Sequence, residues 1–328
     1  MLIFVYNQRL SKTMIRHLFF IAMLILLQTS CEKMVTEQGL VFDYEHISIP
    51  AVENINAVSF PTKTTGYAST SSGLYKTEDS GRTWTLIHPT TPKHIHFHTV
   101  DFGITDRGSY TFDGGLTWEN FGVSCKGATI SEKGEIVLLT KQAVNVSAVW
   151  KAEPFETELQ FIDYLVGIYF SDVEYGQAVN GSAYFYSSGN DGDLIGMNLS
   201  TGAQRTIYIG YKMNAFCLLP DEAMVCGQDG NIARGSITKD YSDVERRYHE
   251  HNYEYLAMDA KDGVFVAVGF HSIASNKKLE IDSYSANINE VLDIHESSFN
   301  ETFKLVDVID ANNMVIVTST NRIYIGNL

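Results

Sequence analysis

Two eight-residue segments of the chain share one template, and this repetition constrains the fold more than any other feature. Residues 77–84 and 111–118 both follow the pattern Thr-x-Asp-x-Gly-x-Thr-Trp. Fixed positions that recur about one repeat length apart indicate a protein built from repeated structural units. After the first threonine, the shared positions are Asp79, Gly81, Thr83 and Trp84 in one copy and Asp113, Gly115, Thr117 and Trp118 in the other.

Turn chemistry explains every position of the template. An aspartate side chain folds onto nearby backbone N–H groups, and the glycine allows a positive φ in the turn. The last threonine leads back into a strand, and the tryptophan gives that strand a large apolar anchor. We therefore expect each segment to be the turn of a β-hairpin. The alternative is that Asp79 and Asp113 form a catalytic or metal-binding pair.

The template is similar to the Asp-box, or BNR, repeat of β-propellers. Residues 55–121 match this group well, and the rest of the chain matches in the rhythm of its short strands. The segment Gly73–Thr77 resembles the photosystem II assembly-factor type, and related repeats occur in sialidases and sortilin-like receptors. The resemblance implies a propeller with binding surfaces at its two ends and in its central channel, without fixing an activity.

Short strands separated by turns continue to the end of the chain. Units of roughly 40 residues predict an all-β protein, a β-propeller of about seven four-stranded blades, with six or eight as alternatives. Val41–Ile49 is a strand without a unit of its own, and Phe303–Ile325 supplies three strands of a last blade. Pairing these two segments would close the ring and remove exposed sheet edges.

The first 30 residues have the features of an export signal. Arg9, Lys12 and Arg16 accompany an apolar stretch, Leu18–Leu27, that is too short to span a bilayer. We expect residues 1–30 to be a signal peptide that does not belong to the fold.

The residues after the apolar stretch resemble a lipobox, the cleavage site of bacterial lipoproteins. The sequence there is Gln28-Thr-Ser-Cys31, whereas the family usually has leucine at the position of Gln28. We expect lipidation at Cys31, a tether at residues 31–40 and a propeller domain at 41–328. The protein would then be anchored through its lipid in the periplasm or at the outer membrane of a Gram-negative-type bacterium. An ordinary cleaved signal peptide is the alternative.

The negative charge of the chain limits the classes of partner that it can bind. The formal net charge is −15, and the signal region holds three of the basic residues and none of the acidic ones. A surface this negative repels phosphate backbones, so we expect no nucleic-acid partner.

Cys217 and Cys226 flank a short turn and could form a disulfide across a hairpin, although two buried free thiols are the favoured alternative.

Three histidines alternate in one predicted strand. His94, His96 and His98 would lie on one face, because side chains of a strand alternate between its two sides. Two neighbouring imidazoles could share a Zn²⁺, and the third would need a bend in the strand. The alternative is a polar strand face opposite the apolar Ile95 and Phe97.

A second polar and aromatic cluster covers residues 248–255. Such a dense group suits a loop that stacks on sugar rings or binds a peptide, with a plain connection between blades as the alternative. The residues of this candidate ligand loop are Tyr248, His249, His251, Tyr253 and Tyr255.

No enzyme motif stands out in the sequence. P-loop, dinucleotide-binding, nucleophile-elbow and HExxH patterns are missing. Sialidase chemistry would need three clustered arginines with a tyrosine nucleophile, and nothing in the sequence selects such a set. We therefore expect a non-enzymatic platform that binds an envelope protein or a glycan without a cofactor. The alternative is a glycan-processing enzyme of the glycoside hydrolase kind on the same fold.

Overall fold

The computed structural model describes the propeller region and leaves the N-terminal segment outside the described residues. The described ranges are 43–49, 53–144, 146–166, 176–187, 193–208, 213–227, 231–238, 241–243, 245–248, 254–269, 272–275 and 302–327. They all belong to one compact unit, Phe42–Leu328. The predicted signal peptide (1–30), the tether (31–40) and Cys31 lie outside them. Within the described ranges, no helix has the length and apolarity needed to span a bilayer.

The described secondary structure consists of β-strands that form seven sheets, here called blades 1 to 7 in chain order. Blade 1 contains β2 (Ile55–Ser59), β3 (Gly66–Thr70), β4 (Gly73–Thr77) and β5 (Thr85–His88). Blade 2 contains β6 (Ile95–Phe97), β7 (Gly103–Thr105), β8 (Ser109–Thr111) and β9 (Glu119–Asn120). Blade 3 contains β10 (Cys125–Ile130), β11 (Ile136–Ala143), β12 (Val146–Ala152) and β13 (Gln160–Val166).

The later blades vary more in their outer strands. Blade 4 contains β14 (Gly176–Val179), β15 (Ser182–Ser187), β16 (Asp193–Asn198) and β17 (Gln204–Tyr208), and β21 (Tyr241–Asp243) pairs in parallel with β17. Blade 5 contains β18 (Met213–Leu218), β19 (Glu222–Gly227), β20 (Asn231–Ser236) and β22 (Glu245–Tyr248). Blade 6 contains β23 (Tyr255–Lys261), β24 (Val264–Gly269) and β25 (Ser272–Ser275). Blade 7 contains β26 (Phe303–Asp310), β27 (Asn313–Thr318), β28 (Ile323–Asn327) and β1 (Asp43–Ile47).

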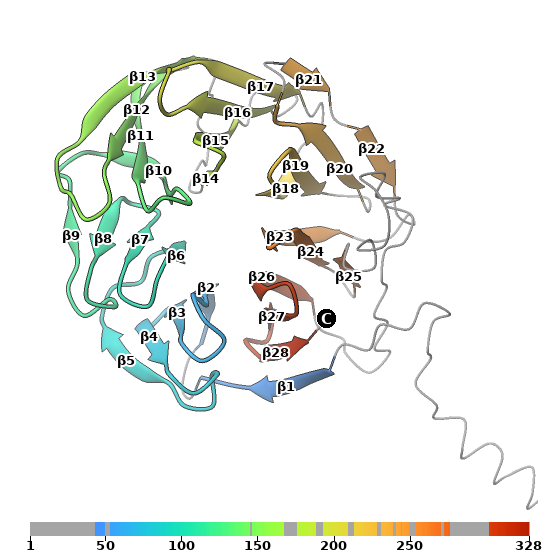
Figure 1. Ribbon diagram of the computed structural model, residues 1–328. Helices are drawn as coiled ribbons and strands as arrows, with labels where there is room; N and C mark the ends of the chain where they lie inside the picture. The colour runs from blue at the N-terminus through green and yellow to red at the C-terminus, as the bar shows by residue number, and fades with distance from the viewer. Residues whose placement is uncertain are drawn as a thin grey trace, which may run out of the picture. The chain divides into compact units, whose positions relative to one another are not determined.

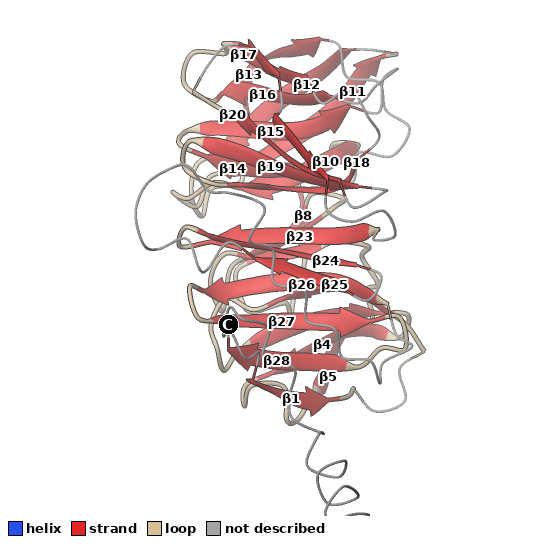
Figure 2. Ribbon diagram, turned by 90° about the vertical axis from the view of Figure 1, so that its right-hand side faces the viewer, coloured by secondary structure: helices blue, strands red, loops and turns tan. Residues whose placement is uncertain are grey.

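The sheets stand around a central axis, with the first strand of each sheet on the inside (Figure 1). The view from the side shows the sheets stacked around this axis (Figure 2). This arrangement confirms the predicted all-β propeller, and the number of sheets lies within the predicted range of six to eight.

The two ends of the described chain close the ring, as the sequence predicted. The N-terminal strand β1 pairs antiparallel with the C-terminal strand β28, and the register runs from Asp43 opposite Asn327 to Ile47 opposite Ile323. In Figure 1 the blue β1 lies beside the red β28. Because β1 supplies the outer strand of blade 7, the last blade is complete only when both chain ends are present.

The hydrophobic core is divided among the junctions between blades. Among the described residues, buried apolar side chains form seven clusters, and each one joins the facing sides of two neighbouring sheets. Leu74 of blade 1 and Phe97 of blade 2, for example, share one cluster. Since each sheet buries both faces in this way, its strands contain apolar residues on both sides, and the ring holds together through side-by-side packing.

Candidate functional site in the central channel

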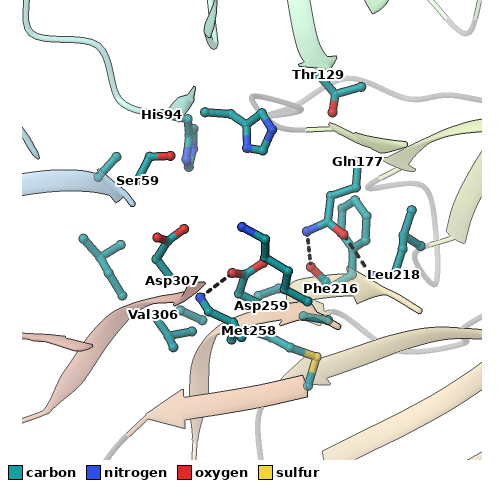
Figure 3. Close-up of a pocket in the computed structure, with 18 of the residues that line it drawn as sticks. Ser59, His94, Thr129, Gln177, Phe216, Leu218, Met258, Asp259, Val306 and Asp307 are labelled. Atoms are coloured by element: carbon teal, nitrogen blue, oxygen red, sulfur yellow. Dashed lines mark hydrogen bonds between the residues drawn. The ribbon is translucent and has the colours of Figure 1, made fainter. Parts of the chain in front are cut away.

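A cavity of about 820 Å³ occupies the centre of the ring. Residues from all seven innermost strands line it: β2, β6, β10, β14, β18, β23 and β26. Polar and apolar groups contribute to its wall in similar measure, and polar side chains such as Gln177, Asp259 and Asp307 face its interior (Figure 3). A concave site on which polar groups from several elements converge is a candidate for ligand binding.

The histidine strand forms one wall of this cavity. His94, His96 and His98 are partly exposed and line the cavity, whereas Ile95 and Phe97 between them are buried in the blade. Burial lowers the pKa of His96 to about 4, with further lowering by His98 and Lys261. Burial, and then Lys261, also lowers the pKa of His98. The imidazole of His96 is therefore neutral at pH 7.

The metal-binding interpretation of these histidines stays a prediction. Among the residues that the structure describes, no group of three or more His, Cys, Asp and Glu side chains is arranged to hold a metal ion. The ammonium group of Lys261 acts on the same imidazoles, and its positive charge opposes binding of a cation.

Two aspartates from neighbouring blades form the opposite wall. Asp259 of β23 and Asp307 of β26 both line the cavity and point toward its interior (Figure 3). Burial, followed by the charge of Asp307, raises the pKa of Asp259, and burial raises the pKa of Asp307. Lys261 counteracts both shifts only in part. Ionisation of one carboxyl group therefore disfavours ionisation of the other, and the pair retains a proton more readily than an isolated aspartate would.

Both aspartates also connect one blade to the next. Oδ2 of Asp259 accepts a hydrogen bond from the backbone N–H of Val308 in blade 7, at 2.7 Å. Oδ2 of Asp307 accepts one from the backbone N–H of Phe60, next to β2 in blade 1, at 2.6 Å. The carboxyl groups therefore hold the inner strands of blades 6, 7 and 1 together.

Neutral side chains make the same kind of connection at two other junctions. The hydroxyl oxygen of Ser59 in blade 1 accepts a hydrogen bond from the backbone N–H of Phe97 in blade 2, at 2.9 Å. Oε1 of Gln177 in blade 4 accepts one from the backbone N–H of Leu218 in blade 5, at 2.8 Å. We call these four contacts, made by Ser59, Gln177, Asp259 and Asp307, the inner-strand bonds.

The template aspartates lie away from the cavity, each in the turn between the third and fourth strands of its blade. Oδ1 of Asp79 accepts hydrogen bonds from the backbone N–H of Thr83 at 2.8 Å and the hydroxyl of Thr77 at 2.9 Å. Its Oδ2 accepts one from the hydroxyl of Thr83 at 2.7 Å. These bonds, the backbone N–H of Thr83 first, lower the pKa of Asp79. The carboxylate thus serves its own turn.

The second turn repeats these contacts. Asp113 accepts hydrogen bonds from the backbone N–H of Thr117 at 2.9 Å, the hydroxyl of Thr117 at 2.6 Å and the hydroxyl of Thr111 at 2.8 Å. Burial opposes ionisation of Asp113, but these bonds outweigh it and lower its pKa. Asp79 and Asp113 lie on different blades and do not converge. Membership of the Asp-box repeat family stays a prediction.

The template glycines are required for two reasons. Gly81 and Gly115 have φ values of 80° and 86°, which a side chain would disfavour. A Cβ at Gly115 would also lie 3.0 Å from side-chain atoms of Leu74 and Ile87 in the preceding blade. Trp118 packs on the cluster between blades 1 and 2, and Trp84 packs on the cluster between blades 7 and 1. The template therefore fixes both a turn and a junction between blades.

The predicted ligand loop at 248–255 is only partly described. Tyr255 is the first residue of β23 and is fully buried in the cluster between blades 5 and 6, so its ring cannot contact a partner. This differs from the prediction, because β23 begins earlier than the polar composition suggested. Tyr248 ends β22, and His249, His251 and Tyr253 lie outside the described residues.

Cys217 and Cys226 are buried free thiols in the same cluster. Burial, then the nearby Asp259, raises the pKa of Cys217 well above its ordinary value. The favoured alternative of two buried thiols agrees with this arrangement, and no disulfide joins them in the structure.

Sequence analysis did not select Asp259 and Asp307 from the 39 acidic residues of the chain. A local signal for them exists. Each is a single carboxylate between apolar neighbours in the middle of a short strand, in Met258-Asp259-Ala260 and Val306-Asp307-Val308. Only the closed ring, however, shows that blades 6 and 7 bring the two side chains together.

Comparison with known proteins places the chain by its fold. No protein-family model matches the chain. A search of curated proteins likewise gave no match. Among solved structures, the chain is similar to YCF48 bound to D1 peptide, with 14% identity, a TM-score of 0.64 and coverage of 90% of this chain and 99% of that one.

Two further structures are similar over most of their length. YCF48 from Cyanidioschyzon merolae has 10% identity and a TM-score of 0.64, with coverage of 86% of this chain and 98% of that one. The Pan2 WD40 domain of Neurospora crassa has 12% identity and a TM-score of 0.60, with coverage of 84% and 89%. At these identities the likeness establishes the fold, a β-propeller with structural neighbours of the YCF48 type.

Proposed function

We propose that this protein is a non-enzymatic β-propeller platform that binds a partner protein or a glycan at its central channel. The observation that carries the proposal is the cavity of about 820 Å³, which all seven inner strands line and into which several polar groups face. The structure of YCF48 bound to D1 peptide gives a precedent for peptide binding on this fold. By analogy, a polypeptide segment is the favoured partner class here.

The proposal includes export and anchoring through a lipid at Cys31, in the envelope of a Gram-negative-type bacterium. It is supported by the basic and apolar segment within residues 1–30 and by the lipobox-like Gln-Thr-Ser-Cys sequence. Cys31→Ser is expected to move the protein from the membrane fraction to the soluble envelope fraction. Unchanged fractionation of this variant would contradict lipidation.

Partner capture tests the binding role. The full-length protein is purified with its partners from detergent-solubilised envelope, beside His98→Trp and Leu116→Trp. His98 lines the cavity, whereas Leu116 is an exposed residue of the second template turn outside it. We expect the native protein and the Leu116 variant to recover the same partner, and we expect the His98 variant to lose it. Recovery of the same partner by all three would place the binding surface elsewhere.

One observation favours a second candidate, a glycan-processing enzyme. Asp259 and Asp307 converge in the cavity, and burial holds the pKa of both above the ordinary range, as a general acid requires. Their inner-strand bonds give both carboxyl groups a structural role that catalysis does not need. We therefore expect no turnover of a glycan panel by the native protein. Turnover that Asp259→Asn and Asp307→Asn each abolish, while the variants stay folded, would establish the enzyme.

A further inference from the structure

The inner-strand bonds differ in chemistry from one side of the ring to the other. Between blades 1 and 2 the acceptor is a hydroxyl, and between blades 4 and 5 it is an amide oxygen. At the two junctions that flank blade 7 the acceptor is a carboxyl group. Blade 7 is also the blade in which the two ends of the described chain meet. The ring thus places ionisable acceptors on both sides of its closure.

A charge is not needed for this contact. The donor-to-acceptor distances at Ser59 and Gln177 are 2.9 and 2.8 Å, within the normal range for neutral hydrogen bonds. A carboxyl group adds a feature that a hydroxyl or an amide lacks, because its charge changes with pH. Since Asp259 and Asp307 lie close together, two ionised groups at this place repel each other.

The surrounding groups do not neutralise two negative charges. Lys261 of β23 acts on both carboxyl groups. From the facing strands, β6 contributes His96 and His98, whose pKa values burial lowers, and β18 contributes Cys217, whose pKa burial raises. Lys304 of β26 is bound instead by the side chains of Asn54 and Asn321, at 2.9 and 2.8 Å. Lys261 is therefore the cation that acts on both carboxyl groups, and His94 also lines the cavity.

We propose that Asp259 and Asp307 make closure of the ring at blade 7 depend on pH, with the junctions tight while the pair retains a proton and looser once both groups are ionised. The inference goes beyond the proposed function and needs no partner. It predicts that the inner wall of the cavity at blades 6, 7 and 1 is the part of the channel that yields as the pH rises.

Stability should fall as the pH rises because of the direction in which the two pKa values are shifted. Burial raises the pKa of both groups in the folded chain above the value in the unfolded chain, and the charge of Asp307 raises the pKa of Asp259 further. Their contribution to stability is therefore fully present below the unfolded pKa, and it is lost as the pH rises through the folded pKa. Asn at either position keeps an oxygen acceptor for the backbone N–H and removes the charge.

The test compares thermal unfolding of the full chain with that of Asp259→Asn and Asp307→Asn between pH 5 and pH 8. In the native protein the unfolding midpoint should fall as the pH rises, and the fall should be at least halved in each variant. Amide hydrogen exchange at Val308 and Phe60 should accelerate with pH, beyond the intrinsic rate, in the native protein only. An equal fall of the midpoint in all three proteins would overturn the proposal.

A converse variant keeps the test decisive if the asparagine variants do not fold. Gln177→Glu introduces a carboxyl group at a junction where the native acceptor is neutral. We expect this variant to resemble the native protein at pH 5 and to unfold at a lower temperature at pH 8. If its midpoint matches that of the native protein at both pH values, an ionised acceptor does not loosen a junction, and the proposal fails.

Discussion

Blade 2 and blade 7 each contain an aspartate that accepts a hydrogen bond from a backbone N–H, yet the pKa values of the two carboxyl groups shift in opposite directions. Asp113 of blade 2 lies in a turn at the protein surface and receives three hydrogen bonds from its own turn, which lower its pKa. Asp307 of blade 7 lies in the channel wall and receives the N–H of Phe60, while burial raises its pKa. The number of donors and the access of water therefore decide the charge, and the residue type does not.

The two blades also differ in how the chain holds them. In blade 2, the hydrogen bonds that hold the template turn join residues at most four positions apart. Blade 7 depends on pairing between β1 and β28, which lie at opposite ends of the chain. Local contacts form at little cost in loop entropy, whereas pairing of β1 with β28 closes a loop that contains nearly all of the described chain. The template turn of blade 2 is thus specified by its own residues, whereas blade 7 is completed only when the ring closes.

The strongest test of this difference is a substitution in the blade 2 turn. Gly115→Ala should destabilise the protein by about 3 kcal/mol, because a Cβ is strained at positive φ and the junction has no room for it. The positive φ is 86°, and the nearest atoms would lie 3.0 Å away. Urea unfolding measures the loss.

Gly122→Ala is the matched control for Gly115→Ala. Gly122 also has a positive φ, 69°, but no atom lies within 4 Å of the position that an added Cβ would take. Only the backbone strain remains there, at about 1 kcal/mol. Equal losses in the two variants would show that the template glycine does not depend on the neighbouring blade.

Features that depend on local contacts could be predicted from the sequence, and features that depend on the closed ring could not. The turns at Asp79 and Asp113, the propeller fold and the closing strand could all be inferred from short patterns, because each depends on turn chemistry or on alternation within a few residues. The common face of His94, His96 and His98 was predictable for the same reason. Their position in the channel was not, because it depends on where the ring places the strand.

The carboxyl pair shows where sequence reasoning ends. Asp259 and Asp307 come from two blades, and nothing within either strand indicates that the other is near. Tyr255 illustrates the opposite error. Its polar neighbours predicted an accessible loop, whereas the packing of blade 6 against blade 5 buries its ring completely. Local composition predicted turns and strands well, but it did not predict which side chains meet or become covered.

Within the channel, His96 gives blade 2 a pH response opposite to that of blade 7. Its folded-state pKa of about 4 lies below the ordinary 6.5, so the unfolded chain binds a proton more readily. Stability is then present above the unfolded pKa and is lost as the pH falls toward 4. Compared with the native protein, His96→Gln should therefore raise the stability at pH 5 relative to that at pH 7 by about 2 kcal/mol. Urea unfolding at both pH values measures this change, and an unchanged difference between the two pH values would show that folding does not lower the pKa of His96.

The smallest effect is expected at the blade 2 aspartate itself. Asp113→Asn keeps one oxygen but loses the acceptor for the hydroxyl of Thr117, which lies 2.6 Å from Oδ2. At pH 7 the loss should be on the order of 1 kcal/mol, because the contact is open to solvent. Because the folded-state pKa is lowered, the native advantage is present above the unfolded pKa and disappears as the pH falls through the folded one. Asp307→Asn should instead become more stable relative to the native protein as the pH rises.

Asp101→Asn, at an exposed residue of blade 2, is the control, and its stability should change little. If the Asp113 and Asp307 variants respond to pH with the same sign, the two carboxyl groups do not occupy the opposed environments that separate blade 2 from blade 7.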